Sequence, residues 1–286
     1  MVFRVGCHVS ISGSVDLAFD RAKKLNCNTF QIFTKNPRGW SARQLNDNEV
    51  YSFRDQLNHK ILFPVVSHIS YLPNLASQSK EIYEKSINSF LLELERSLTL
   101  HIPYFIIHGG SYKGSAKEQG FETYVNSILK GVEITKGKVV ILIENSSGSK
   151  NSITGVFPDI MRILNEVNDK KVVQVCFDTC HAFSAGYDLQ NKKGVINTLE
   201  EMESLIGIEN VAIIHANDST GDLGSHRDNH EHIGLGKIGE TGFKELVNHP
   251  LLSKKPWILE TPVNEIRGDS DNIKYLKMLR NKELWD

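Results

Sequence analysis

The sequence has few of the features that mark several large classes of protein. Only four cysteines occur in 286 residues, so a disulfide framework is not expected. No apolar run reaches the roughly 18 residues that a membrane span needs. The first residues, MVFRVGCHVSISGS, lack the charged-then-apolar layout of a signal peptide. We therefore expect a soluble, intracellular, cytoplasmic protein in a reducing compartment.

The sequence also lacks a strong charge of either sign. Its 33 basic and 34 acidic side chains leave a formal net charge of −1. No bulk basic field therefore indicates nucleic acid, although a local patch or bound cations can supply positive charge. No low-complexity tract or linker interrupts the chain. With an ordinary apolar content of 40%, we expect one domain over residues 1–286.

Short apolar runs recur along the chain, with helical or polar stretches between them. Most lack alternation, which is typical of parallel strands buried on both faces. Apolar residues at helical spacing predict helices over Gln78–Leu100 and Asp159–Val167. Eight units of roughly 36 residues fit an α/β fold of the (β/α)8 TIM-barrel type, and a doubly wound open sheet is the alternative. The eight predicted strands are Arg4–Val9, Asn28–Phe33, Leu62–Ser67, Tyr104–His108, Val139–Glu144, Val172–Asp178, Val211–Asn217 and Pro256–Glu260.

Six successive predicted strands each deliver a metal-competent side chain at or just after the C-terminal end. In a barrel these ends converge on one mouth. A lone histidine at a strand end is more often a hydrogen-bonded core residue than a ligand, but buried charges in such number need cations. Five histidines and four carboxylates are too many for one tetrahedral zinc and suit two or three ions. The nine residues are His68, His108, Glu144, Asp178, His181, His215, Asp228, His230 and Glu260.

This donor set favours zinc, with manganese or iron as substitutes. Asp178 and His181 are separated by Thr179–Cys180, which we interpret as a short turn. Asp228 and His230 lie two apart, so in an extended loop both can face one ion. His226 and His232 are nearby alternatives that spacing does not separate from them.

Three stretches of the sequence resemble the endonuclease IV family of apurinic/apyrimidinic (AP) endonucleases. They are HISYLPNLA at His68–Ala76, VCFDTCHAFSAGYD at Val175–Asp188 and IHANDSTGDLGSHRDNHEHIGLG at Ile214–Gly236. GCHVSISG, KNPRGW, HGGS, IENSSG and ILETP also fit in order, so the resemblance covers nearly the whole chain. It implies a TIM barrel with a trinuclear zinc site at the C-terminal mouth of its strands.

Carried over position by position, the resemblance assigns each ligand to an ion. His68, His108 and Glu144 would hold one zinc. Glu144, Asp178, His215 and Glu260 would hold the second, with Glu144 as a bridge. His181, Asp228 and His230 would hold the third, which leaves His226 and His232 in other roles. Glu144 and Glu260 would be catalytic by orienting the nucleophile, and His8 would lie behind the ligands or contact phosphate.

The resemblance also implies the reaction and the partner. A member of this family hydrolyses the phosphodiester bond 5′ to an abasic site in duplex DNA during base excision repair. The products are a 3′-hydroxyl and a 5′-deoxyribose phosphate, and blocked 3′ ends are a further substrate. Lys35, Asn36, Arg38 and Tyr71 would contact DNA, with Arg38 and Tyr71 as candidate wedges. We expect a monomer.

Two other functions remain open from the sequence. A xylose-isomerase-like sugar isomerase or epimerase also places Glu, Asp and His at strand ends, but the Asp228 and His230 pair would be surplus. A non-catalytic protein that binds abasic DNA or sequesters metal would not need a bridging glutamate. Cys176 and Cys180 flank Asp178, and we interpret them as small buried thiols rather than ligands.

Overall fold

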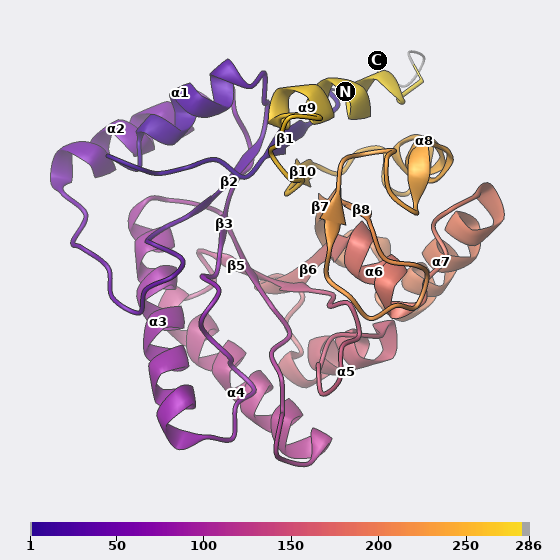
Figure 1. Ribbon diagram of the computed structural model, residues 1–286. Coiled ribbons are helices and arrows are strands. Elements are labelled where there is room, and N and C mark those ends of the chain that lie inside the picture. The colour runs from indigo at the N-terminus through magenta and orange to yellow at the C-terminus, as the bar shows by residue number, and fades with distance from the viewer. Residues whose placement is uncertain (1, 282–286) are drawn as a thin grey trace.

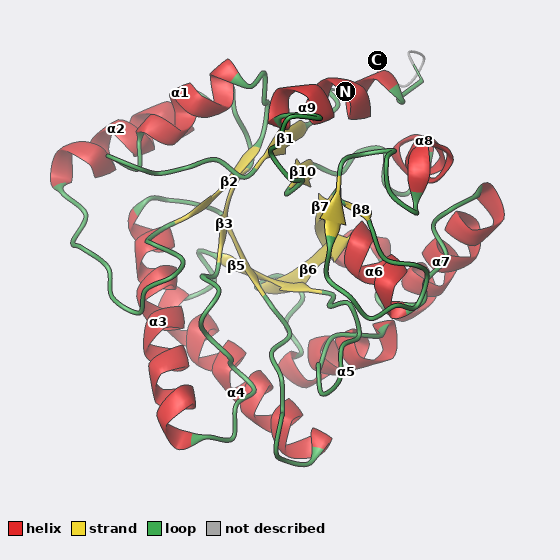
Figure 2. Ribbon diagram, in the orientation of Figure 1, coloured by secondary structure: helices red, strands yellow, loops and turns green. Residues whose placement is uncertain are grey.

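The structure is a computed structural model that describes residues 2–281. Eight parallel strands form a ring with the helices around its outside (Figures 1 and 2). The expected domain of residues 1–286 extends into residue 1 and residues 282–286, which lie outside the described residues. The barrel strands are β1 (Val5–Cys7), β2 (Phe30–Phe33), β3 (Val65–His68), β4 (Tyr104–Ile107), β5 (Val140–Glu144), β6 (Val173–Asp178), β7 (Val211–His215) and β10 (Trp257–Leu259).

In the strand order β1-β10-β7-β6-β5-β4-β3-β2, β1 and β2 stand at the two ends of the sheet. A parallel bridge between His8 and Gln31 joins them, and the Val9 amide donates to the Gln31 carbonyl at 2.8 Å. The sheet therefore closes on itself, which confirms the TIM barrel and excludes the open doubly wound sheet. All eight predicted strands are present, each within a few residues of its predicted bounds.

Helices cover the outer face of the ring (Figure 2). The apolar stripe predicted for α3 faces the core: Ile87 and Leu94 are buried, and Tyr83, Leu91 and Leu98 pack against the core partly buried. The α-helices are α1 (Leu17–Lys24), α2 (Asp47–Asn58), α3 (Lys80–Thr99), α4 (Lys117–Thr135), α5 (Phe157–Val167), α6 (Thr179–Ala185), α7 (Lys192–Leu205), α8 (Gly239–Asn248) and α9 (Asp269–Met278). Within residues 2–281, no helix is both long and apolar enough to cross a membrane.

The interior of the barrel has a small core of its own, separate from the larger core between strands and helices. Six strands contribute one buried side chain each to this inner core, namely Val66, Ile106, Leu142, Cys176, Ile213 and Ile258. All four cysteines are buried and free. The buried thiols expected at positions 176 and 180 are therefore confirmed.

Two short segments near the mouth differ from the sequence prediction. Thr179–Cys180 is not a free turn but the start of α6, because the Asp178 carboxylate caps this helix and accepts from the His181 amide at 2.7 Å. The segment with Asp228 and His230 is tied down by a two-stranded antiparallel sheet of β8 (Asp218–Ser219) and β9 (His230–Glu231). The helix cap and the small sheet both fix side chains that reach the mouth.

Candidate metal centre

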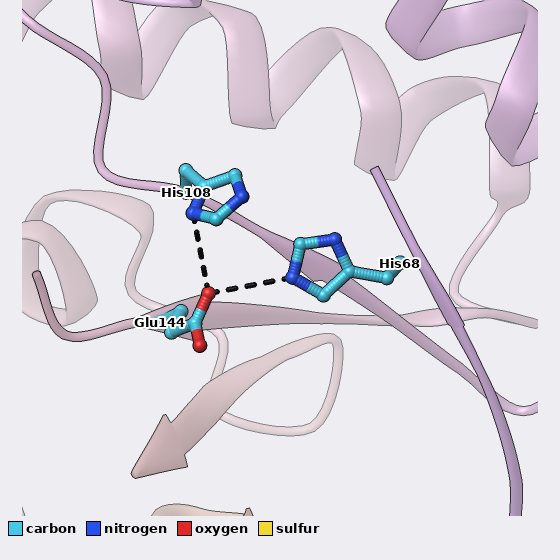
Figure 3. Close-up of side chains that lie close together, drawn as sticks. All are labelled: His68, His108 and Glu144. Carbon is cyan, nitrogen blue, oxygen red and sulfur yellow. Dashed lines mark hydrogen bonds and ion pairs between the residues drawn. The ribbon is translucent and has the colours of Figure 1, made fainter. Parts of the chain in front are cut away.

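The first group of donors at the mouth comprises His68, His108 and Glu144. The Nε2 atom of His68 lies 3.4 Å from Glu144 Oε2, and His108 Nδ1 lies 3.3 Å from the same oxygen. Figure 3 shows both rings facing this one oxygen. The other nitrogen of His68, Nδ1, hydrogen-bonds the Ile69 carbonyl at 2.7 Å. His68 therefore keeps Nε2 free to face the carboxylate.

The second group comprises Glu144, Asp178, His215 and Glu260. His215 Nδ1 lies 2.7 Å from Glu144 Oε1, 3.5 Å from Glu260 Oε2 and 3.8 Å from Asp178 Oδ2. His215, Asp178 and Glu144 are at most 1% exposed. Three carboxylates thus converge on one ring nitrogen, two of them buried and the third, Glu260, with a 21% exposed side chain.

The third group comprises Asp178, His181, Asp228 and His230. Asp228 Oδ1 lies 3.1 Å from His181 Nε2 and 3.2 Å from His230 Nε2. The Nδ1 atoms of these two rings bond to protein carbonyls, His181 to Asn145 at 2.9 Å and His230 to Glu260 at 3.0 Å. Although Asp228 is this close, the buried Nε2 of His230 makes no hydrogen bond of regular geometry within residues 2–281.

The arrangement fits a site for several cations. In His68, His181 and His230, one ring nitrogen hydrogen-bonds a protein carbonyl and the other faces carboxylates. This pattern is typical of metal-binding histidines. The orphaned Nε2 of His230 is accounted for if it coordinates an ion. Glu144 belongs to the first and second groups and Asp178 to the second and third, so the groups are contiguous.

The charges at the mouth require positive partners. Burial alone would raise the pKa of Glu144, but His215 and His68 hold its pKa well below the usual value. Burial also opposes protonation of His181, yet Asp178 and Asp228 raise its pKa well above the usual value. Burial and the neighbouring His68 lower the pKa of His108 to about 4, so this ring is a neutral donor near pH 7. Such carboxylates need cations, and metal ions can take that place.

Of the six histidines outside these groups, three were considered for a role at the site, namely His8, His226 and His232. His8 lines the cavity at the mouth, and its Nδ1 lies 3.0 Å from the side-chain nitrogen of Gln31 and 3.9 Å from Glu260 Oε1. His232 is buried between Asn264 and Asn272, and His226 Nδ1 lies 3.2 Å from the Ser147 carbonyl. The structure therefore separates His230 from its two neighbours in sequence, which spacing alone left unresolved.

The cysteines near the mouth also approach potential ligands. The Cys176 sulfur lies within 4.8 Å of donor atoms of Glu144 and His215, and the Cys180 sulfur is equally close to Asp228 and His230. Burial raises the pKa of each thiol to about 12. Without a bound ion, both thiols therefore stay protonated at neutral pH.

The residues predicted to contact DNA lie in two different environments. Asn36, Arg38 and Tyr71 are exposed on the rim of the mouth, with Tyr71 61% exposed. The Tyr71 amide donates to the Pro37 carbonyl at 3.2 Å, and its ring meets Phe33 edge-on at 5.1 Å. The two loops that carry Arg38 and Tyr71 are therefore in contact beside a cavity of about 480 Å³ that reaches the donor groups.

Lys35 requires a correction. Its side chain is 1% exposed, and its ammonium lies 3.6 Å from Glu93 Oε1 and donates to the Gly39 carbonyl. Glu93 also accepts from the amide and hydroxyl of Ser70 at 3.0 and 2.7 Å. A lysine held in this way does not reach a surface phosphate, so the predicted phosphate contact is wrong. The pair instead ties the loop after β2 to α3 and to the segment before Tyr71.

Sequence reasoning missed three amide side chains that hold the donors in place. Asn145 exchanges two hydrogen bonds with the Asp178 backbone, at 2.7 and 3.0 Å. Asn217 donates to Asp178 Oδ2 at 2.7 Å and accepts from the Glu260 amide at 2.8 Å. Gln31 bonds to both Glu260 and His215. Their signal in the sequence was a polar residue inside or just after an apolar strand.

Comparisons with known proteins agree with this geometry. Residues 19–281 match a family described as a xylose isomerase-like TIM barrel. The chain is 45% identical to a probable endonuclease 4 of Methanoculleus marisnigri, over 96% of this chain and 98% of that protein. Endonuclease IV from Thermus thermophilus superposes with a TM-score of 0.85 at 34% identity, covering 96% of this chain and 98% of that one. A D-tagatose 3-epimerase-like protein shares the fold at 17% identity, with a TM-score of 0.72 and coverage of 97% and 98%.

Proposed function

The chain belongs to the endonuclease IV family of AP endonucleases, and from this membership we propose that it incises duplex DNA on the 5′ side of abasic sites. Membership makes it a hydrolase that cleaves the phosphodiester bonds of DNA. The products would be a 3′-hydroxyl and a 5′-deoxyribose phosphate. The observation that carries the proposal is the contiguous set of donor groups, in which Glu144 and Asp178 are each shared.

We propose that three zinc ions occupy these groups, with manganese or iron as substitutes. His68, His108 and Glu144 would hold the first. Glu144, Asp178, His215 and Glu260 would hold the second, and His181, Asp228 and His230 the third. When bound, such ions supply Lewis acidity and positive charge for phosphodiester hydrolysis. All nine side chains come from one chain, which supports a monomer as the active form.

The protein groups have separate tasks in this reaction. Glu144 and Glu260 would orient the attacking water, since an ionised carboxylate accepts a hydrogen bond from it. The pKa of Glu260 is well below its usual value although burial opposes this, because His215 lies next to it. Glu260 is therefore ionised at neutral pH. In this form it acts only as a hydrogen-bond acceptor, as orienting the water requires.

Selectivity for abasic DNA would come from the rim of the mouth. A nucleotide without its base leaves the helix at lower cost than an intact one. Tyr71 and Arg38 lie on adjoining loops beside the cavity and could fill the gap that the nucleotide leaves. At a blocked 3′ end, the blocking group is joined through a similar phosphate ester and carries no base. Removal of a 3′-blocking group would therefore use the same site.

The test uses a duplex oligonucleotide with one tetrahydrofuran abasic analogue, which cannot undergo β-elimination. We expect zinc-loaded protein to incise 5′ to the analogue, and Glu260→Gln to be roughly 10²–10³-fold slower. Glu265→Gln, which changes an exposed glutamate five residues away, should match the unaltered protein. Metal analysis should give three ions per chain. Turnover of a ketose without incision would instead favour a sugar isomerase, and binding without incision a non-catalytic protein.

A further inference from the structure

Gln31 is a buried polar residue in an otherwise apolar strand. β2 consists of Phe30, Gln31, Ile32 and Phe33, and Gln31 is 0% exposed. A buried amide needs partners at both its oxygen and its nitrogen. Gln31 finds them at the mouth of the barrel, and two of them are metal-competent residues from β7 and the end of β10.

The contacts of the Gln31 amide permit one consistent assignment. Its Nε2 donates to Glu260 Oε1 at 2.5 Å and lies 3.0 Å from His8 Nδ1, while its Oε1 lies 2.8 Å from His215 Nε2. A carboxylate only accepts, so the NH₂ end must face Glu260. The amide oxygen then faces His215 and can only accept, so Nε2 of His215 carries a proton.

This assignment determines how His215 meets the second donor group. With the proton on Nε2, Nδ1 is the nitrogen whose lone pair would be available when the ring binds a cation. That atom faces Glu144 at 2.7 Å and Glu260 at 3.5 Å. The second N–H of the Gln31 amide donates to His8, so the Nδ1 atom of His8 is the acceptor. One side chain thus fixes the tautomer of one donor and the orientation of another.

We propose that Gln31 is a positioning residue that holds His215 and Glu260 so that both present donor atoms to the same cation. Gln31 itself does not contact the ion. The inference rests on the proposed function, which assigns a cation to the group of Glu144, Asp178, His215 and Glu260. The C-terminal ends of β1 and β2 contribute none of the nine donors. The inference therefore gives β2 a part in the site through Gln31.

A structural role in closing the barrel can be separated from this positioning role. Closure at Gln31 uses the main chain, through the bridge to His8 and the bond from the Val9 amide. A change of side chain leaves those bonds available. Gln174 offers a matched control, because it lies in β6 and, within residues 2–281, its side chain bonds the Lys170 carbonyl at 3.3 Å and none of the nine donors.

The experiment compares Gln31→Met with Gln174→Met by chelator competition. Methionine keeps the length of the side chain but can neither donate to Glu260 nor accept strongly from His215. We expect Gln31→Met to lose about 10–100-fold in affinity for its most weakly held zinc. The visible spectrum of the cobalt-substituted protein should also change. Gln174→Met should match the unaltered protein in both measurements.

Gln31→Glu provides a second variant of nearly the same shape, useful if the methionine variant does not fold. Its carboxyl group can donate to Glu260 only when protonated and repels Glu260 when ionised. We expect its incision rate to approach that of the unaltered protein at acidic pH and to fall as pH rises. The unaltered protein should lack this additional loss.

The outcomes separate the inference from the proposed function. If the unaltered protein binds no metal or does not incise the abasic duplex, the proposed function fails. If it does both, and Gln31→Met keeps the same chelator midpoint and cobalt spectrum while Gln31→Glu keeps the same pH profile, Gln31 has no positioning role.

Discussion

Individual residues at the mouth have their orientation set by hydrogen bonds behind the donor atoms. The Nδ1 atoms of His68, His181 and His230 bond to carbonyls, so each ring presents Nε2 to its neighbours. Tyr71, on the rim, is held in a different way. Tyr71 is 61% exposed, its ring meets Phe33 in a T-shaped arrangement, and it lines the cavity that reaches the donor groups.

Tyr71→Ala should weaken binding to abasic duplex DNA without removing metal. Loss of an aromatic surface that stacks at a kinked step costs roughly 1–3 kcal/mol, or about 5–150-fold in affinity. Fluorescence anisotropy with a labelled abasic duplex would measure this, together with metal analysis of the same sample. Tyr51→Ala, at a 74% exposed tyrosine of α2, is the matched control. Unchanged affinity in Tyr71→Ala would reject the wedge role.

Glu49 should make the stability of the fold depend on pH. Hydrogen bonds from Arg43, at 2.5 and 2.6 Å, lower the pKa of Glu49 to about 2. A glutamate in an unfolded chain titrates near ~4.3. The stabilisation is therefore complete above that pH and disappears as pH falls through the folded-state pKa.

Glu49→Gln should accordingly lower the free energy of unfolding by about 1–2 kcal/mol at pH 7, a value that allows for the 54% exposure of the Arg43 side chain. Urea titrations should show this difference shrinking between pH 4.5 and 2. Glu81→Gln removes an exposed partner of Lys85 and should have no measurable effect. A difference that stays constant with pH would contradict the assignment.

At the scale of elements, loops that carry functional residues are fastened by buried charges. Arg96 of α3 donates to the Thr34 and Arg43 carbonyls, and Glu93 of the same helix pairs with Lys35. These bonds hold the long loop between β2 and α2 against the barrel. Asp218 of β8 does the same for the loop that carries Asp228 and His230.

Asp218→Asn should loosen the segment that carries Asp228 and His230. The buried Asp218 carboxylate accepts from the amides of Gly234, Gly236 and Ile238, at 3.0, 3.0 and 2.9 Å. An asparagine would turn an NH₂ group toward some of these donors, at a cost of about 2 kcal/mol. We expect faster hydrogen exchange over residues 220–239 and a lower metal content.

Asp222→Asn tests whether the replacement of any aspartate in this loop by asparagine has the same effect. The Asp222 side chain is 86% exposed and pairs with Lys237 at 3.6 Å. Its variant should retain the exchange protection and metal content of the unaltered protein. Equal behaviour of the two variants would show that the Asp218 contacts do not order the loop.

At the scale of the whole molecule, the metal-competent groups join strands from most of the barrel. His68, Glu144, Asp178 and His215 end four different strands, and Glu260 follows a fifth. The carboxylates repel one another unless cations lie between them. Bound ions would therefore link the C-terminal ends of these strands, so metal binding and folding stability should be coupled.

Removal of metal by a chelator should lower the melting temperature, and zinc should restore it. A ligand that binds only the folded state stabilises by about 2.7 kcal/mol at one hundred times its Kd, which shifts the midpoint of a domain of this size by several degrees. Differential scanning calorimetry before and after dialysis against chelator would measure the shift. Magnesium, which prefers oxygen ligands, should restore little of it.

Much of this architecture is determined by the sequence. Continuous apolar runs indicated buried parallel strands, and parallel strands in a barrel present all their C-terminal ends at one mouth. The position of His108, Glu144 or His215 at the end of its run was therefore enough to predict that they meet. Motif resemblance then supplied the division of the nine residues among ions.

Only the tertiary structure decided how those side chains are held and which neighbours lie apart from them. Spacing did not separate His230 from His226 and His232, because the choice depends on the pairing of β9 with β8. Lys35 is buried against Glu93 of α3, and Gln31 reaches residues 184 and 229 positions away. Such contacts join segments that are remote in sequence, so no local pattern records them, whereas strand ends are local and can be predicted.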